Sequence, residues 1–247
     1  MSVDETIAAL DRGELRVAEK HDGEWRVNEK AKAAILEYFR VRKLEPIDVG
    51  PFEYLDKIPL KRDHAERGVR VVPPATARYG SFLSPGVVLM PSYVNIGARV
   101  GVNTMVDTWA TVGSCAQIGA NVHLSGGVGI GGVLEPPQAS PVIVEDDCYI
   151  GSRSIVAEGA FVGRNTVLGA GCILTGSVPV IDAQTGAEVG RGTVPANSVA
   201  VSATRSRRFG SHEFGMPCIL IIKQVSDGER HDKNQLNDLL REHGASL

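Results

Sequence analysis

The chain has 247 residues, of which 43% are hydrophobic, only 5% are aromatic and 28 are glycine, and its formal net charge is −3. This charge gives no electrostatic basis for binding nucleic acid or an anionic membrane, and no apolar run reaches the length of about 18 residues that a membrane-spanning helix needs. The first twenty residues are too polar for a signal peptide and the four cysteines lack CxxC spacing, so we expect a cytoplasmic protein without disulfides or a metal site.

Residues 1–68 lack the repeat that follows and are expected to form a small, mainly helical N-terminal cap. Apolar residues recur at helical spacing within 4–10 and within 28–42. Residues 15–27 predict a β-hairpin that turns at Asp22 and Gly23. A solenoid has hydrophobic ends that need covering, so a segment of different sequence is expected beside it.

Residues 69–204 predict a parallel β-helix built from hexapeptide repeats, and so a mainly β protein. Every sixth residue is apolar from Phe82 to Ile130 and again from Val144 to Val180. This period fits neither a helix nor an ordinary strand, but it fits a chain that turns a corner every six residues. A small or slim residue comes four positions after each aliphatic. The residue directly after the aliphatic is often glycine, as expected where a corner needs unusual backbone angles.

Two insertions near 133–141 and 181–192 interrupt the six-residue phase, and the second predicts a hairpin that turns near 184–186. Residues 205–247 predict a short C-terminal extension with a basic cluster at 205–208, an apolar strand at 218–223 and a polar helix at 234–243. Flat aliphatic faces favour burial in a symmetric oligomer, and three faces favour a homotrimer.

Three segments, at 90–97, 104–119 and 121–136, carry a resemblance that coil geometry does not require. They include Met-Val-Asp-Thr-Trp-Ala-Thr-Val-Gly-Ser at 105–114 and closely resemble the tetrahydrodipicolinate N-succinyltransferases of the diaminopimelate route to lysine. The resemblance continues through 15–20, 68–74, 143–151 and 194–202. It implies a left-handed β-helix, a homotrimer with sites between subunits, and transfer of a succinyl group from succinyl-CoA to the amine of the opened dicarboxylate acceptor, L-2-amino-6-oxopimelate. The sequence does not distinguish succinyl-CoA from acetyl-CoA.

The resemblance also implies residue roles. Asp107 is the catalytic candidate that meets the acceptor amine, and Arg70 binds the acceptor's carboxylates with a planar guanidinium. The other expected acceptor contacts are Met105, Trp109 and Ser125. Bare backbone at 125–132 allows close approach of a pantetheine arm, and basic side chains suit CoA phosphates. The expected donor contacts are Gly126, Gly132, Ser152, Arg153, Ala170, Arg205 and Lys223.

Each assignment has a structural alternative. Asp107 could be a turn aspartate that bonds local amides, and Arg70 a surface arginine. His123, beside the inward Leu124, favours a structural or ligand-lining role over that of a base, and His212 lies in the C-terminal extension. The glycine-rich run lacks the Lys-Ser/Thr of a phosphate loop. No cysteine stands in a Cys-His signature, so we expect direct attack by the amine without an acyl-enzyme.

One departure from the resembled family keeps a second enzymatic function open, and a non-catalytic role is a separate alternative. A family glutamate corresponds to Ile155 here, and Glu158 is expected on another face of the coil. The chain could therefore be a divergent paralogue that acylates the same or a related amino acid in secondary metabolism, as in tabtoxin-type pathways. It could also be a non-catalytic β-helix scaffold, although retention of the motif at 105–109 argues against that.

Overall fold

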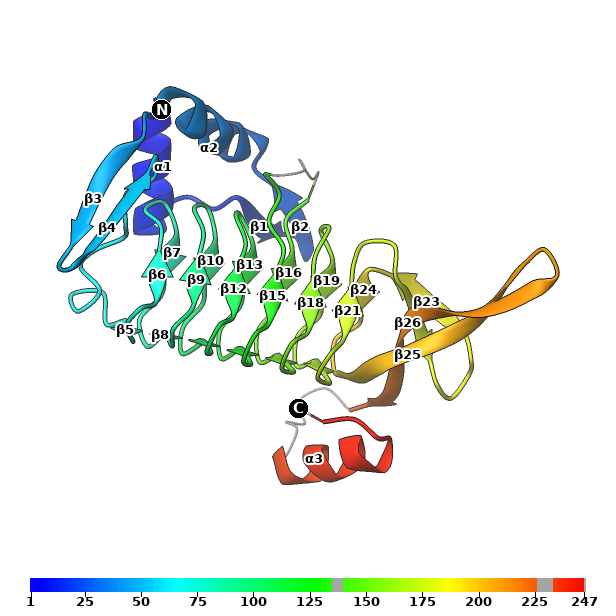
Figure 1. Ribbon diagram of the computed structural model, residues 1–247. Helices are drawn as coiled ribbons and strands as arrows, with labels where there is room; N and C mark the ends of the chain where they lie inside the picture. The colour runs from blue at the N-terminus through cyan, green and yellow to red at the C-terminus, as the bar shows by residue number, and fades with distance from the viewer. Residues whose placement is uncertain (135–139, 226–232, 247) are drawn as a thin grey trace.

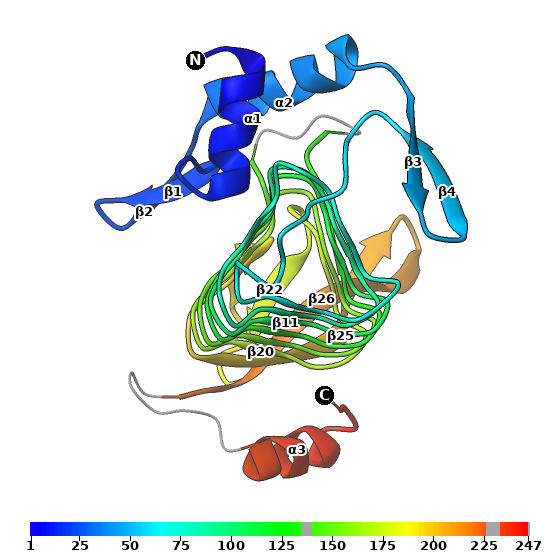
Figure 2. The ribbon, with the colours of Figure 1, turned by 90° about the vertical axis from the view of Figure 1, so that its left-hand side faces the viewer.

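The computed structural model describes residues 1–134, 140–225 and 233–246, and its core is a three-sided parallel β-helix (Figures 1 and 2). The predicted mainly β, hexapeptide-repeat fold is confirmed. None of the helices in the described part is long and apolar enough to cross a membrane.

Each turn of the coil contributes one two-residue strand to each of three parallel faces. The first face consists of β5 (Arg70–Val71), β8 (Val88–Leu89), β11 (Met105–Val106), β14 (His123–Leu124), β17 (Tyr149–Ile150) and β20 (Val167–Leu168). The second face consists of β6 (Thr76–Ala77), β9 (Tyr93–Val94), β12 (Thr111–Val112), β15 (Gly129–Ile130), β18 (Ile155–Val156) and β21 (Ile173–Leu174). The third face consists of β7 (Phe82–Leu83), β10 (Arg99–Val100), β13 (Gln117–Ile118), β16 (Ile143–Val144), β19 (Phe161–Val162) and β24 (Thr193–Val194).

The second residue of each of these strands points inward, and the inward aliphatics stack into one continuous core. Consecutive coils align residues 18 apart, as in the pairing of Met105 with His123. The expected phase is wrong at its start, because Leu83 and Leu89 are the buried residues rather than Phe82 and Val88. The corner between Leu89 and Val94 is one residue short, which shifts the earlier coils by one position.

The glycines that follow the inward aliphatics serve close stacking, and the expectation of unusual backbone angles there is wrong. They are absent from the residues with positive φ. A Cβ at Gly113 would lie 2.3 Å from the backbone nitrogen of Gly132 in the next coil, so only a glycine allows the coils to approach this closely. Positive φ occurs instead two positions later, at residues such as Trp109 (φ 61°) and Arg153 (φ 62°).

The N-terminal region contains α1 (Val3–Arg12), β1 (Ala18–His21), β2 (Glu24–Val27), α2 (Glu29–Val41), β3 (Glu45–Val49) and β4 (Phe52–Asp56). Ser2 forms a capping box with Glu5 at the start of α1, and the β1–β2 hairpin turns at Asp22 and Gly23, both with positive φ, as predicted. The β3–β4 hairpin was not predicted; it projects from the coil in Figure 2.

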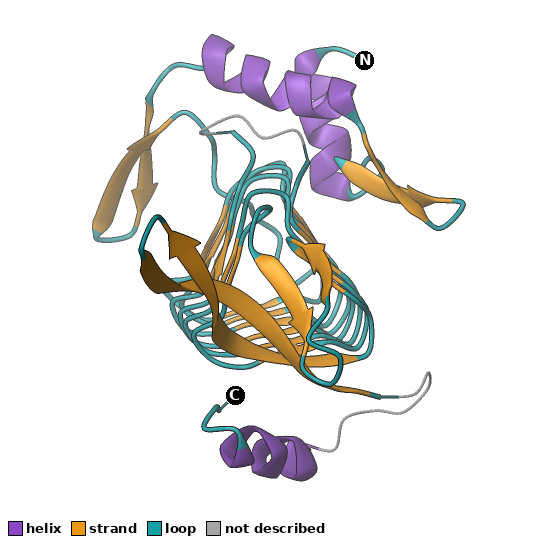
Figure 3. Ribbon diagram, turned by 90° about the vertical axis from the view of Figure 1, so that its right-hand side faces the viewer, coloured by secondary structure: helices purple, strands orange, loops and turns teal. Residues whose placement is uncertain are grey.

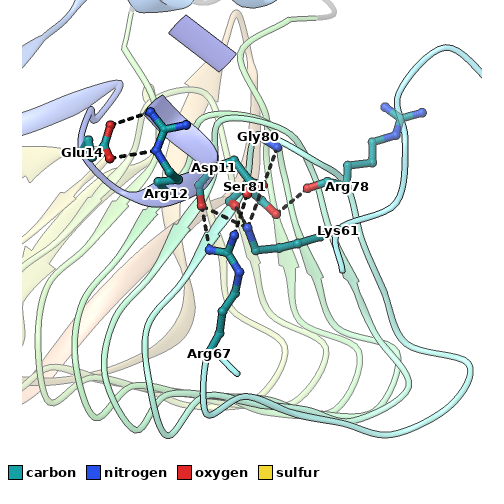
Figure 4. Close-up of polar contacts among 8 residues, drawn as sticks. All are labelled: Asp11, Arg12, Glu14, Lys61, Arg67, Arg78, Gly80 and Ser81. Carbon is teal, nitrogen blue, oxygen red and sulfur yellow. Dashed lines mark hydrogen bonds and ion pairs between the residues drawn. The ribbon is translucent and has the colours of Figure 1, made fainter. Parts of the chain in front are cut away.

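This region lies along the side of the coil, whereas the sequence predicted a cover for its end. Ile35 of α2 packs with Ile96, Cys115 and Val133 at the corner between the second and third faces. A buried ion cluster adds to the attachment (Figure 4): Asp11 of α1 accepts hydrogen bonds from Lys61 Nζ at 2.7 Å and from Arg67 at 3.0 Å. The cluster thereby fixes α1 at the first coil, while α2 packs along the coils that follow.

The C-terminal part extends the sheet of the first face with β25 (Ser198–Phe209), β26 (His212–Gln224), β22 (Pro179–Asp182) and β23 (Glu188–Arg191). The β22–β23 hairpin turns where predicted. The basic cluster at 205–208 lies on β25, which continues across the expected boundary at 204/205 to form a long projecting hairpin with β26 (Figure 3). The final helix α3 (Lys233–Glu242) packs Leu240 against Val167 and Val199 of the first face. Part of the expected first insertion, 135–139, is outside the described residues.

Candidate active site

Most of the candidate residues lie on one corner of the coil, between the first and second faces, which we call the first edge. Its turns comprise residues 72–75, 90–92, 107–110, 125–128, 151–154 and 169–172. The candidates on this edge are Asp107, Trp109, Ser125, Gly126, Ser152, Arg153 and Ala170. Met105 and Arg70 lie beside it, on strands of the first face joined through Val88. The fold therefore places the acceptor candidates, and part of the donor set, on one strip.

Asp107 begins the turn that follows β11, and its carboxylate has two different environments. Oδ1 accepts a hydrogen bond from the Thr108 backbone nitrogen at 2.6 Å and lies 3.2 Å from Thr108 Oγ1. Oδ1 therefore makes the bond to a local amide that is typical of a turn aspartate, as the sequence analysis allowed. Oδ2 faces the other way and lies 3.8 Å from His123 Nε2. The side chain is 31% exposed, so one oxygen anchors the carboxylate while the other is accessible along the edge.

The sequence analysis assigned His123 a structural or ligand-lining role and assigned Tyr149 none, and both extend the site. They occupy the outward positions of β14 and β17, directly after Met105 in the register of the first face. Their rings stack at a centroid distance of 4.8 Å with 8° between the planes. The coil period of 18 residues could have identified His123 as the neighbour of Met105, but the insertion before β16 hides the equivalent relation to Tyr149.

The bare backbone at 125–128 and Arg153 provide a cationic stretch on the same edge as Asp107, one and two coils further along. The Arg153 side chain crosses Gly127 of the preceding coil, since a Cβ at that glycine would lie 2.7 Å from Arg153 Cδ. In the described part of the chain neither Arg153 nor the exposed Arg70 has a carboxylate partner. Ser125 Oγ is buried and makes no hydrogen bond to the described residues. The strip therefore combines one carboxylate, unpaired guanidinium groups and a buried hydroxyl.

Trp109 has a positive φ of 61° and is 65% exposed. A bulky residue in this backbone conformation is strained, and within the single chain no burial of the indole offsets the strain. The indole is consequently presented on the edge as an exposed aromatic surface.

Three expected donor contacts lie elsewhere in the single chain. Gly132 is on the corner between the second and third faces, where it lines a cavity of about 590 Å³ with Ser114 and Phe39. Arg205 on β25 forms an ion pair with Glu188 at 2.8 Å, and Lys223 is exposed on β26 opposite Val199. The structure does not bring these residues to the Asp107 strip within one chain.

Ile155 and Glu158 belong to different parts of the coil. Ile155 points outward from β18 on the second face, is 39% exposed and touches the bare backbone of Gly129. Glu158 lies on the following corner with a φ of 56°. Glu158 therefore lies away from the first edge that carries Asp107. The sequence predicted this separation.

The cysteines are poorly suited to act as nucleophiles. Burial raises the pKa of the Cys115, Cys148 and Cys172 thiols to about 12, so they stay protonated near neutral pH. Among the residues that the structure describes, no group of three or more His, Cys, Asp or Glu side chains is placed to hold a metal ion.

The hexapeptide β-helix and the matching family models place the chain in the class of hexapeptide-repeat acyltransferases. The family model for the hexapeptide repeat of succinyl-transferase matches residues 141–176, and the model for the tetrahydrodipicolinate N-succinyltransferase N-terminal region matches residues 1–41. This class uses an acyl-CoA donor and a small-molecule acceptor.

Curated relatives identify the family. The 2,3,4,5-tetrahydropyridine-2,6-dicarboxylate N-succinyltransferase of Acinetobacter baylyi is 51% identical over 97% of this chain and 89% of its own length. The enzyme of the same name from Polynucleobacter asymbioticus is 50% identical over 98% of this chain and 89% of its own. The chain therefore belongs to the tetrahydrodipicolinate N-succinyltransferase family.

Proposed function

We propose that this protein transfers the succinyl group of succinyl-CoA to the amine of L-2-amino-6-oxopimelate, the opened form of tetrahydrodipicolinate, on the diaminopimelate route to lysine. The observation that carries the proposal is full-length similarity to enzymes of that name, together with Asp107 of the shared motif on an accessible edge. The same two observations argue against a silent scaffold.

Asp107 orients and deprotonates the attacking amine. An amine must be neutral to attack a thioester, and a nearby carboxylate can hold it and receive its proton as the nitrogen–carbon bond forms. With Oδ1 fixed by Thr108, Oδ2 remains available for this contact. Because the buried thiols stay protonated, direct attack by the amine is favoured over an acyl-enzyme.

Arg70 and Arg153 suit the carboxylates of the two substrates. The acceptor has two carboxylates, and Arg70 stands on the first face beside the strip. The succinyl group ends in a further carboxylate that an acetyl group lacks, and Arg153 is a cation without a described acidic partner on the same edge as Asp107. Charge-assisted contacts of this kind favour succinyl-CoA over acetyl-CoA.

A homotrimer would add a second chain to the strip. The first edge presents the exposed Trp109, and the neighbouring second face presents Ile155 and Ile173, which are 39% and 53% exposed. Apolar surface of this kind favours burial against another copy of the chain. In such a trimer, Gly132, Arg205 and Lys223 of one copy would contact the acyl-CoA donor bound at the first edge of the adjacent copy.

The test is turnover of Asp107→Asn with succinyl-CoA and tetrahydrodipicolinate. We expect kcat to fall by about 10²-fold or more, the lower range for loss of a general base. Asp147→Asn is the matched control, since Asp147 occupies another corner of the coil and bonds Asn121 there. Near-normal turnover of Asp107→Asn, or equal losses in both variants, would sink the assignment.

The donor preference has its own measurement. Arg153→Met is expected to lower kcat/KM for succinyl-CoA at least tenfold while changing that for acetyl-CoA little. A parallel loss with both donors would show that Arg153 does not bind the acyl carboxylate.

A further inference from the structure

We propose that His123 is the positioning residue of Asp107, and that the two side chains, aligned by Tyr149, share the proton released by the attacking amine. This inference rests on the proposed function and adds to it two residues outside the motif that contains Asp107. It is carried by the stacking of three consecutive coils on the first face.

The geometry directs the imidazole toward the carboxylate. Met105, His123 and Tyr149 are consecutive outward residues across β11, β14 and β17. Asp107 leaves β11 at the corner, and its Oδ2 lies 3.8 Å from His123 Nε2. This distance allows an ion pair and is longer than a hydrogen bond, as is common for catalytic pairs before substrate binds.

Tyr149 fixes the plane of the imidazole. A centroid separation of 4.8 Å with 8° between the planes is an offset stack, one of the favoured arrangements of aromatic rings. Tyr149 is itself packed against the cluster that contains Val167 and Leu240 of α3. His123, about 30% exposed, is therefore held in orientation by the stack, with its Nε2 3.8 Å from Asp107 Oδ2.

The chemistry needs a proton acceptor of this kind. As the acceptor nitrogen forms a bond to the thioester carbon, the carbon–sulfur bond breaks and the nitrogen must lose one proton. An imidazole nitrogen is a stronger base than a carboxylate oxygen, so it holds the released proton more readily. The proton passes from nitrogen to Asp107 Oδ2 and on to His123 Nε2, and it finally protonates the leaving sulfur to give CoA thiol. The Asp107 carboxylate stabilises the imidazolium while the proton is held.

The experiment compares the full-length wild-type chain with two variants that lose the imidazole nitrogens of His123. His123→Phe retains a ring that can stack on Tyr149, and we expect kcat to fall about 10²-fold with KM changed less than threefold. His123→Ala opens space at a solvent-accessible position, and added imidazole is expected to restore part of its rate. His212→Phe, on the projecting hairpin, is the matched control and should retain wild-type kcat.

The stack is tested separately. Tyr149→Phe keeps the ring and is expected to retain more of kcat than Tyr149→Leu, with similar KM in both. A kcat of His123→Phe within threefold of wild type would overturn the proposal, as would a His123→Ala variant that no concentration of imidazole rescues. Absence of transfer by the wild-type protein would instead refute the proposed function itself, so the two failures are distinguishable.

Discussion

Replacing Asp11 by asparagine is expected to loosen the N-terminal region from the coil. The carboxylate is 6% exposed and accepts bonds from Lys61 Nζ at 2.7 Å, Arg67 at 3.0 Å and the Gly80 backbone nitrogen at 3.0 Å. Lys61 is 1% exposed, so its ammonium has almost no access to water once Asp11 is neutral. Figure 4 shows this cluster between α1 and the first coil.

The magnitude follows from the charge that is left behind. Breaking a buried pair by removing one charge costs about 3–5 kcal/mol. For a chain of this size each kcal/mol lowers the unfolding midpoint by about 2–4 °C, so the expected shift is roughly 6–20 °C. Burial lowers the pKa of Lys61, and the hydrogen bond that Lys61 donates to Asp11 opposes that fall, so the variant lowers the pKa further. The folded variant then binds fewer protons than the unfolded chain, and its stability deficit should shrink as pH rises toward the ordinary lysine range.

The assay is thermal unfolding followed by Trp25 fluorescence in a Trp109→Phe background. Trp25 donates a hydrogen bond to Glu145 at 3.0 Å and so reports the docking of the N-terminal region. The matched control is Arg12→Met, which removes the neighbouring but exposed Arg12–Glu14 pair and should leave the midpoint unchanged. If Asp11→Asn shifts the midpoint no more than the control does, the reasoning about the buried charge is refuted.

Four further predictions concern the site, the assembly and the buried thiols. Ile155→Glu should raise kcat/KM on tetrahydrodipicolinate by roughly tenfold or more, because a charge-assisted bond contributes about 1.5–3 kcal/mol; full wild-type activity without a gain would show that Asp107 works alone. Sedimentation at micromolar concentration should give about three times the 26.3 kDa of one chain, and a single-chain mass would contradict the trimer. At pH 8 iodoacetamide should label Cys115, Cys148 and Cys172 only after denaturation, since their pKa is raised to about 12. Because the unfolded thiols release protons from about pH 9 that the folded ones keep, stability should also fall between pH 9 and 12, and an unchanged urea midpoint there would contradict the shift.

Part of the candidate site could be predicted from a contiguous motif, and part forms only where neighbouring coils stack. Asp107 was predictable because the motif at 105–109 is contiguous, and its partly exposed position followed from the corner after β11. The relation of Asp107 to His123 was not predicted, because these residues are 16 positions apart and meet only through the coil register. Tyr149 was further concealed, since the insertion before β16 places it 26 residues after its partner His123.

The inward positions of most coils could be read from the sequence because each hexapeptide decides locally which residue faces the core. The Asp22-Gly23 turn was likewise predictable, since it depends on the backbone preferences of two adjacent residues. The stacking role of Gly113, the shortened corner before Val94 and the side-on docking through Asp11 appeared only in the tertiary structure. Each of these three features depends on which backbone segment lies in the adjacent coil. The adjacent segment is set by the summed lengths of all intervening corners and insertions, and no local sequence pattern contains that information.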